Sequence, residues 1–148
     1  MAQYSTDNDL LEYEPDILDL GIPEFKDLHQ KSYEDINRLI EIEWWPRASF
    51  RNYDITRASY QSMEESKLVD SQWKRSAVYH VLYAYIYPRL STFSPEGDVY
   101  REKMEYYKAK FQEEFNLCLR QGVKYDYNAD STISNSEEQP AHFNRLVR

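Results

Sequence analysis

Apolar side chains recur every three or four residues along several long stretches of the chain, which is the spacing of a buried helical face. The strongest stretch runs from Ser71 to Ile86 (SQWKRSAVYHVLYAYI) and is followed at once by YPRL. Ser71 is the expected N-cap, and Pro88 is expected to end or kink this helix. A helix this apolar must be packed on several sides, so we expect the other helices to be its packing partners.

Two further long helices are predicted, from Pro23 to about Glu43 and from Val99 to Gln121. The first ends at Trp44-Trp45-Pro46, because the residue before a proline is pushed out of the helical region. The second is expected to be capped by Asp98 and to end at Gly122. Its apolar stripe consists of Tyr100, Met104, Tyr107, Phe111, Phe115 and Cys118.

The rest of the chain has no long periodic run. A short helix capped by Thr6 is expected over 6–12, a further helical turn over 15–21, and an irregular loop over 47–69. From Val123 onward polar and small residues dominate. We therefore predict an all-α fold, a small bundle of about four helices over residues 1–122, followed by an acidic loop and an extended C-terminal tail over residues 123–148.

Composition narrows the function. The 148 residues suffice for one core, and the 3 Gly argue against a turn-rich barrel and against phosphate-binding glycine loops. The net charge of −8 opposes binding to nucleic acid phosphates. The 14 Tyr suit surfaces that are part buried and part wet, as subunit interfaces are. The sequence carries neither a signal-peptide pattern nor a membrane-span pattern, so we expect synthesis in the cytoplasm and no membrane partner.

The patterns that mark an enzyme do not occur in the sequence. His29, His80 and His142 lie in three different segments without metal-ligand spacing. The single cysteine, Cys118, lies on an apolar helical stripe, which is typical of an inert core thiol. Adjacent glutamate pairs such as Glu113-Glu114 point about 100° apart on a helix and are typical of solvated faces. We therefore expect no catalytic residues and no enzymatic activity.

One local motif matches a metal site. Residues 126–137 fit the calcium-loop template at most of its ligand positions. The departure is Ser131, which stands where the template has Gly, and Pro140 prevents a normal exit helix. The alternative is a turn-rich hinge that begins the tail, without any cofactor. The oxygen ligands would be Asp126, Asn128, Asp130, the Thr132 carbonyl and Glu137, with Ser134 reached directly or through water.

Aromatic and basic residues gather after the first long helix. Trp44 and Trp45, together with Phe50 and Tyr53, are a candidate subunit interface, or else the rim of the core. A basic–aromatic mixture could instead contact nucleic acid, although the acidic net charge favours an ordered loop or short strands that pack on a partner protein. The arginines in question are Arg47, Arg51 and Arg57.

Several segments together resemble a known family. These are the opening TDNDLLEYEPDILDLGI, the helix end IEIEWWP, the central helix running into YIYPRLSTF, the segment YREKMEYYKAKFQEEFNLCLRQGVKYDYNADSTIS and the closing RLVR. They resemble the head–tail adaptor (neck, or head-completion) proteins of tailed bacteriophages. The resemblance covers nearly the whole chain as a match of overall pattern, and its most specific part runs from Gln72 to Asp130.

The resemblance implies a helical structural protein of the virion, located at the head–tail interface. Family members form a ring, usually of twelve copies, beneath the portal protein, and the ring extends the channel through which genomic DNA passes without sequence-specific binding. The ring also offers a platform for the next neck or tail-terminator protein. The alternatives left open are another neck or tail-completion protein one layer further out, and a calcium-binding interaction module.

The resemblance also implies roles for particular residues. Family members commonly reach the portal with an extended C-terminal arm and often carry a calcium-loop-like stretch before it. Within the ring, we expect Trp45→Ala to weaken assembly more than it weakens the fold. In the arm, Phe143, Leu146 and Val147 would be apolar anchors, and Arg145 and Arg148 would form ion pairs.

Overall fold

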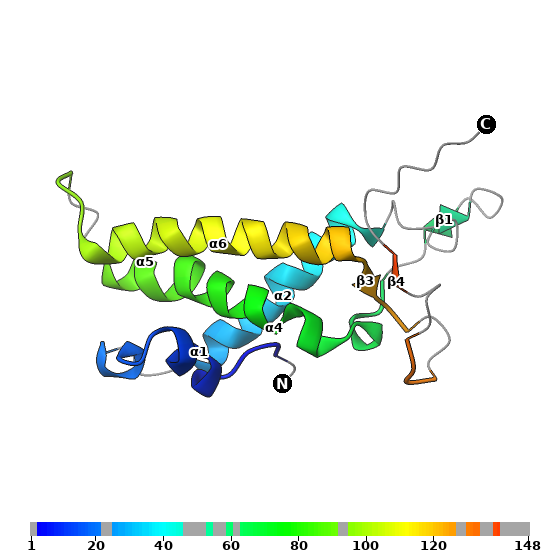
Figure 1. Cartoon of the computed structure of the whole chain (residues 1–148), viewed down its shortest axis with the longest axis horizontal. Coiled ribbons are helices and arrows are strands. Elements are labelled where there is room, and N and C mark those ends of the chain that lie inside the picture. Colours follow the sequence, from blue (N-terminus) through cyan, green and yellow to red (C-terminus); the bar gives the residue numbers. More distant parts are fainter. Residues whose placement is uncertain are drawn as a thin grey trace. The chain divides into compact units, whose positions relative to one another are not determined.

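The computed structural model describes residues 3–21, 25–45, 53–54, 59–60, 63–91, 95–126, 130–133 and 138–139. The chain is all-α, as predicted. Its helical elements are α1 (Asp7–Tyr13), η1 (Ile17–Asp19), α2 (Lys26–Glu43), η3 (Glu65–Lys67), α4 (Asp70–Val81), η4 (Leu82–Ile86), α5 (Tyr87–Leu90) and α6 (Val99–Gln121) (Figure 1). The strands, each of two residues, are β1 (Tyr53–Asp54), β2 (Ser59–Tyr60), β3 (Val123–Lys124) and β4 (Glu138–Gln139).

The chain divides into two compact units. Unit 1 consists of Met1–Asp35 and Trp73–Phe115, and unit 2 consists of Ile36–Gln72 and Asn116–Arg148. Helices α2, α4 and α6 each contribute residues to both units. The predicted division along the chain, with a bundle up to residue 122 and a loop and tail from 123, stays a prediction.

The helix ends follow the capping residues of the sequence. At α1, Thr6 and Asp9 form a capping box, in which the Asp9 carboxylate accepts the Thr6 backbone N–H at 2.8 Å. At α6, the Asp98 carboxylate accepts the Arg101 N–H at 2.8 Å. Gly122 follows α6 at φ +112°, a conformation that costs glycine little. The predicted bounds of α6 are confirmed.

The central helix differs from the prediction near both ends. It begins at Asp70, so Ser71 lies inside the first turn and is not the N-cap. Pro88 does not end it, because the chain stays helical to Leu90. A π-helical turn, η4, precedes the proline, and the Tyr87 N–H donates to the Leu82 carbonyl five residues back. Since proline cannot donate to the carbonyl four residues back and its ring crowds that group, a widened turn just before it relieves the conflict.

Unit 1 is held together by the faces that the sequence periodicity predicted. In this unit α6 runs beside the α4–η4–α5 helix (Figure 1), and ring pairs join the two: Trp73 to Phe115, Tyr83 to Phe111 and Tyr87 to Tyr107, with centroids 5.5 to 5.9 Å apart. The pairs run in opposite sequence order, so the two helices are antiparallel. The apolar core of the unit contains Leu10, Ile17, Phe25, Leu28, Val78, Val81, Leu82, Ile86, Tyr87 and Tyr107.

The described part of unit 2 contains two short strand pairs, of which the sequence allowed for one, in the segment after the tryptophans, and did not predict the other. Strand β3 pairs antiparallel with β4, and β1 pairs antiparallel with β2. Val123 is 0% exposed and Tyr125 is 2% exposed, although both fall where a polar loop was predicted. Their spacing of two residues is that of one face of a strand, and it is too short for a periodicity search to find.

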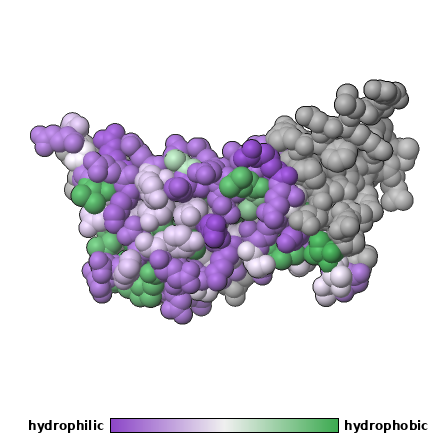
Figure 2. All heavy atoms as spheres, viewed as in Figure 1, coloured by the Kyte–Doolittle hydropathy of each residue, from purple (hydrophilic) through white to green (hydrophobic). Residues whose placement is uncertain are grey.

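On the face shown in Figure 2, hydrophilic side chains dominate the described part, and hydrophobic side chains form separate small patches. Among the described residues, no helix has both the length and the apolar character needed to cross a membrane.

Candidate functional site

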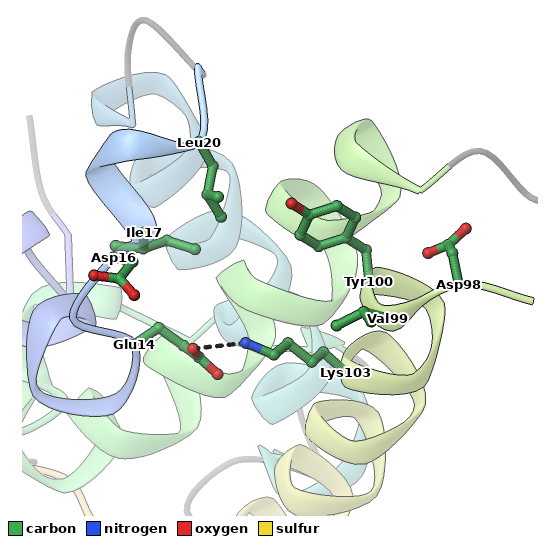
Figure 3. A pocket seen from close by; sticks show the side chains of 8 residues that line it. All are labelled: Glu14, Asp16, Ile17, Leu20, Asp98, Val99, Tyr100 and Lys103. Atoms are coloured by element: carbon green, nitrogen blue, oxygen red, sulfur yellow. Dashed lines mark hydrogen bonds and ion pairs between the residues drawn. The ribbon is translucent and has the colours of Figure 1, made fainter.

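A cleft of about 470 Å³ opens at the surface of unit 1. It lies between the segment that contains η1 and the first turns of α6 (Figure 3), and its walls carry both acidic and apolar side chains. Val99, at its edge, is 61% exposed. The lining residues are Glu14, Asp16, Ile17, Leu20, Asp98, Val99, Tyr100 and Lys103.

Glu14 is the charged centre of this cleft. Its Oε2 accepts a hydrogen bond from Lys103 Nζ at 2.9 Å, and its Oε1 accepts one from the Tyr107 hydroxyl at 2.7 Å. Burial alone would raise the pKa of the Glu14 carboxyl. The Tyr107 hydrogen bond and the hydrogen bond and charge of Lys103 oppose it, and the pKa lies below its usual value. The carboxylate is therefore ionised and committed to holding the start of α6 against the segment after α1.

Two buried histidines of unit 1 each lie between a serine and an aspartate. His29 Nδ1 is 2.7 Å from Ser5 Oγ, and its Nε2 is 2.9 Å from Asp7 Oδ1. Since a carboxylate only accepts, Nε2 carries the hydrogen and Nδ1 accepts from the serine. Burial lowers the pKa of His29, and the hydrogen bond and charge of Asp7 oppose this only in part. The ring is therefore neutral at pH 7.

His80 repeats the arrangement with different partners. Its Nδ1 is 2.9 Å from Ser32 Oγ, and its Nε2 is 3.8 Å from Asp35 Oδ2. Asp35 also accepts a hydrogen bond from the Tyr85 hydroxyl. Burial lowers the pKa of His80 to about 4.

Both sets resemble a catalytic triad by composition only. A nucleophile must meet its substrate, whereas Ser5 is 1% exposed and Ser32 is 0% exposed. The serines also bind Nδ1 and the aspartates lie on the Nε2 side, which reverses the arrangement of the serine-protease template. In both sets the buried serine and histidine are joined by a hydrogen bond and an aspartate lies on the other side of the ring, so the contacts join distant segments of the fold. The sequence gave no sign of these contacts, because the partners lie 22 to 48 positions apart.

Trp44 and Trp45, half of the candidate subunit interface, lie inside unit 2. They are 0% and 3% exposed. Their rings contact the Tyr125 ring at centroid distances of 5.7 and 5.0 Å. The Tyr125 hydroxyl in turn accepts the Glu64 backbone N–H at 3.1 Å. The two tryptophans therefore need no second subunit to be buried.

Elsewhere in unit 2, the side chain of Gln72 joins the first turn of α4 to the residues that follow α6. Its Nε2 donates to the Gly122 carbonyl at 2.7 Å, and its Oε1 accepts the Lys124 N–H at 3.0 Å. Cys118, the single cysteine, is buried, and its Sγ lies 3.5 Å from the Gln72 carbonyl. The cysteine is thus a packed core thiol, as predicted.

The calcium-loop motif is described only in part, since Asn128, Ser134 and Glu137 lie outside the described residues. The Asp126 carboxylate accepts the N–H groups of Asp130 at 3.2 Å and Ser131 at 2.9 Å. Ser131 has φ +63°, the left-handed conformation that the template assigns to Gly. In the described part of the chain, no three His, Cys, Asp or Glu side chains are grouped as a metal site would require. Calcium binding here stays a prediction.

The predicted arm residues Phe143, Arg145, Leu146, Val147 and Arg148 lie outside the described residues, as does Phe50. Tyr53 is described only by its backbone, in β1.

No family model matches the chain, and neither the curated proteins nor the solved structures contain a match to it.

Proposed function

We propose that this chain is a structural protein of a bacteriophage neck, forming a ring under the portal that extends the DNA channel and joins head to tail. The observation that carries the proposal is the run from Gln72 to Asp130, which resembles the head–tail adaptor family. An all-α fold is what that resemblance implies, and the observed helices agree with it.

Three features of the chain support this proposal. The net charge of −8 suits a channel through which DNA slides without being held. The predicted C-terminal arm combines apolar residues with two arginines, which suits docking on a partner protein better than packing in the chain's own core. His29 and His80, the two histidines in the described part of the chain, are occupied by structural contacts.

In the proposed ring the partners are further copies of the chain, the portal protein, and the next neck or tail-terminator protein. A cyclic ring requires two different patches on each subunit, because every copy meets its neighbours head to tail. The arm would reach the portal through Phe143, Leu146 and Val147, with Arg145 and Arg148 paired to acidic groups. No metal is required for this function.

Co-purification with the portal tests the arm. The full-length chain is mixed with the portal protein of its source phage, and the complex is measured by sedimentation. We expect a complex that the Phe143→Ala, Leu146→Ala double variant fails to form. Leu18→Ala, a change at a side chain that is 44% exposed in unit 1, is the matched control and should bind as the parent does. Equal binding by all three chains would contradict the assigned role of the arm.

Calcium binding by residues 126–137 is the remaining alternative function. The observation that favours it is the left-handed backbone of Ser131 at the template's glycine position. A bound ion would stabilise the folded chain by mass action. Melting with and without millimolar calcium separates the two functions: protection that Asp126→Asn abolishes would favour the calcium module, and unchanged melting would remove it.

A further inference from the structure

Helix α6 has a second apolar stripe, distinct from the one that packs in the core. Among the described residues, five large apolar side chains are exposed, and three of them are on α6: Val99 at 61%, Tyr106 at 56% and Leu117 at 44%. At 100° per residue, the three lie within about 20° of one another around the helix axis. The buried stripe, represented by Tyr107 and Phe111, lies roughly 100° away.

The positions between these three complete a coiled-coil seam. Lys103, Lys110 and Glu113 fall on the same stripe, and the six positions are separated by alternating steps of four and three residues. This is the spacing at which one helix packs lengthwise against another. Apolar residues lie at the two ends of this seam, and charged residues with one tyrosine lie between them. We call this set of six residues the α6 seam.

We propose that the α6 seam binds the α6 seam of a second copy of the chain, with the two helices antiparallel. In that register Val99 of each copy lies against Leu117 of the other copy. Lys103 meets Glu113, and Tyr106 meets Lys110. Every contact occurs twice, as a two-fold axis requires.

The charged side chains of the α6 seam favour a second copy in the antiparallel direction over one in the parallel direction. In a parallel pair, Lys103, Lys110 and Glu113 would each face their own counterpart, so every charged contact would be repulsive. In the antiparallel pair the same residues form two Lys–Glu ion pairs and two contacts of a lysine with a tyrosine ring. Lys110 Nζ already lies 5.6 Å from the Tyr106 ring centroid within one chain, so this contact suits both side chains.

Two details limit the strength of the contact. Lys103 already binds Glu14 at 2.9 Å, but its side chain remains 40% exposed and its ammonium has further donors for Glu113 of the other copy. Glu102 and Glu114 would approach each other on the flank of the seam, which opposes binding. We therefore expect a reversible dimer in exchange with the monomer.

This inference does not rest on the proposed function. A two-fold contact closes at two copies, whereas a cyclic ring needs a head-to-tail contact. The α6 dimer would therefore be a state of the free chain, separate from any ring. Absence of the chain from virions would not contradict the α6 dimer, and absence of the α6 dimer would not contradict the proposed neck ring.

Disulfide trapping tests the register. Two full-length chains are prepared in a Cys118→Ser background, one with Val99→Cys and the other with Leu117→Cys, and are mixed under mild oxidation. We expect a cross-linked heterodimer from the mixture and little product from either chain alone, because like positions would be about 27 Å apart along the helices. Ile42→Cys in place of Val99→Cys is the control, since Ile42 is 57% exposed on α2. Equal cross-linking with the control, or more from Val99→Cys alone, would overturn the register.

Sedimentation of the unmodified chain tests the contact itself. We expect a mass that rises with concentration from 17.9 kDa toward twice that value. Glu113→Lys puts a positive charge in each copy against Lys103 of the other copy. This repulsion, which occurs twice, should weaken the dimer at least tenfold. Glu65→Lys makes the same charge change on exposed η3 and should leave the dimer intact. A monomer at every concentration, or the same effect from both substitutions, would overturn the proposal.

Discussion

The two units of the chain are built by different kinds of contact. In unit 1, long helices bury continuous faces, and their ring pairs follow the helix repeat, as Trp73–Phe115 and Tyr87–Tyr107 do. In unit 2, the described centre is a cluster of Trp44, Trp45 and Tyr125, which come from two segments about eighty residues apart. The first kind of core follows from local sequence pattern, whereas the second depends on chain segments meeting at a few large side chains.

The comparison predicts that unit 2 is the more sensitive to loss of one side chain. Trp45→Ala removes a ring that is 3% exposed and contacts both Trp44 and Tyr125, so we expect the free energy of unfolding to fall by about 3–5 kcal/mol. The sequence alone led us to expect a larger effect on assembly than on the fold. The burial of Trp45 within one chain is the reason to expect a large effect on the fold as well, while the effect on assembly stays a prediction.

Urea unfolding, followed by tryptophan fluorescence, measures this change. Ile42→Ala is the matched control, because Ile42 lies three residues before Trp45, near the end of α2, and is 57% exposed, and its effect should stay within about 0.5 kcal/mol. A loss below about 1 kcal/mol for Trp45→Ala would mean that the ring is not part of the core.

In unit 1, the largest expected effect is a loss of folding stability at acid pH. Burial lowers the pKa of His80, and the nearby Asp35 charge opposes this only in part, so the pKa in the folded chain is about 4. In the unfolded chain the same ring takes up its proton near pH 6.5. The contribution to stability is therefore complete above pH 6.5 and is lost as the pH falls from 6.5 to about 4, by about 3 kcal/mol in all.

Urea unfolding at several pH values between 7 and about 4.5 measures this loss. His80→Phe should remove most of the pH dependence, and the smaller remainder belongs to His29, whose pKa is also lowered. Glu14 titrates below this range, because its pKa is lowered from 4.5. An unchanged slope in His80→Phe would show that His80 is not buried as a neutral ring.

Removing Ser32, the hydrogen-bond partner of His80, should have a smaller effect on stability. Ser32→Ala leaves His80 Nδ1 buried without its donor, which should cost about 1–3 kcal/mol. Ser71→Ala, at an exposed position on α4, is the control for the substitution itself and should be nearly neutral. Equal stability of the two variants, measured by thermal melting, would argue against the hydrogen bond.

The smallest expected change in stability is in unit 2, and it is an increase where the preceding substitutions cause a decrease. Ser131 has φ +63°, where a side chain is strained, so Ser131→Gly should stabilise the chain by up to about 1 kcal/mol. Thr132→Gly is the control, because glycine there relieves no positive φ and should destabilise through greater chain entropy. If both substitutions lower the melting temperature alike, the strain at Ser131 is not present in solution.

The sequence predicted what depends on nearest neighbours along the chain. Capping chemistry located the start of α1 at Thr6 and both ends of α6 at Asp98 and Gly122, and apolar periodicity identified the buried stripe of α6. Pro88 was expected to end or kink its helix, but a π-helical turn precedes the proline and the chain stays helical to Leu90.

What the sequence could not predict depends on contacts between distant segments. Val123 and Tyr125 looked like part of a polar tail because only two apolar residues alternate there. The serine partners of the two histidines gave no signal, since hydrogen bonds across 24 and 48 positions have no local pattern. Glu14 was likewise indistinguishable from the other acidic residues until Lys103 and Tyr107 were seen to bind it.

The most direct test of the proposed neck ring is quantitative mass spectrometry of purified virions from the source phage. The chain is counted against the portal and the major capsid proteins. The account predicts a copy number close to that of the portal, because the ring is proposed to lie directly beneath it. Absence of the chain from intact particles would contradict the account.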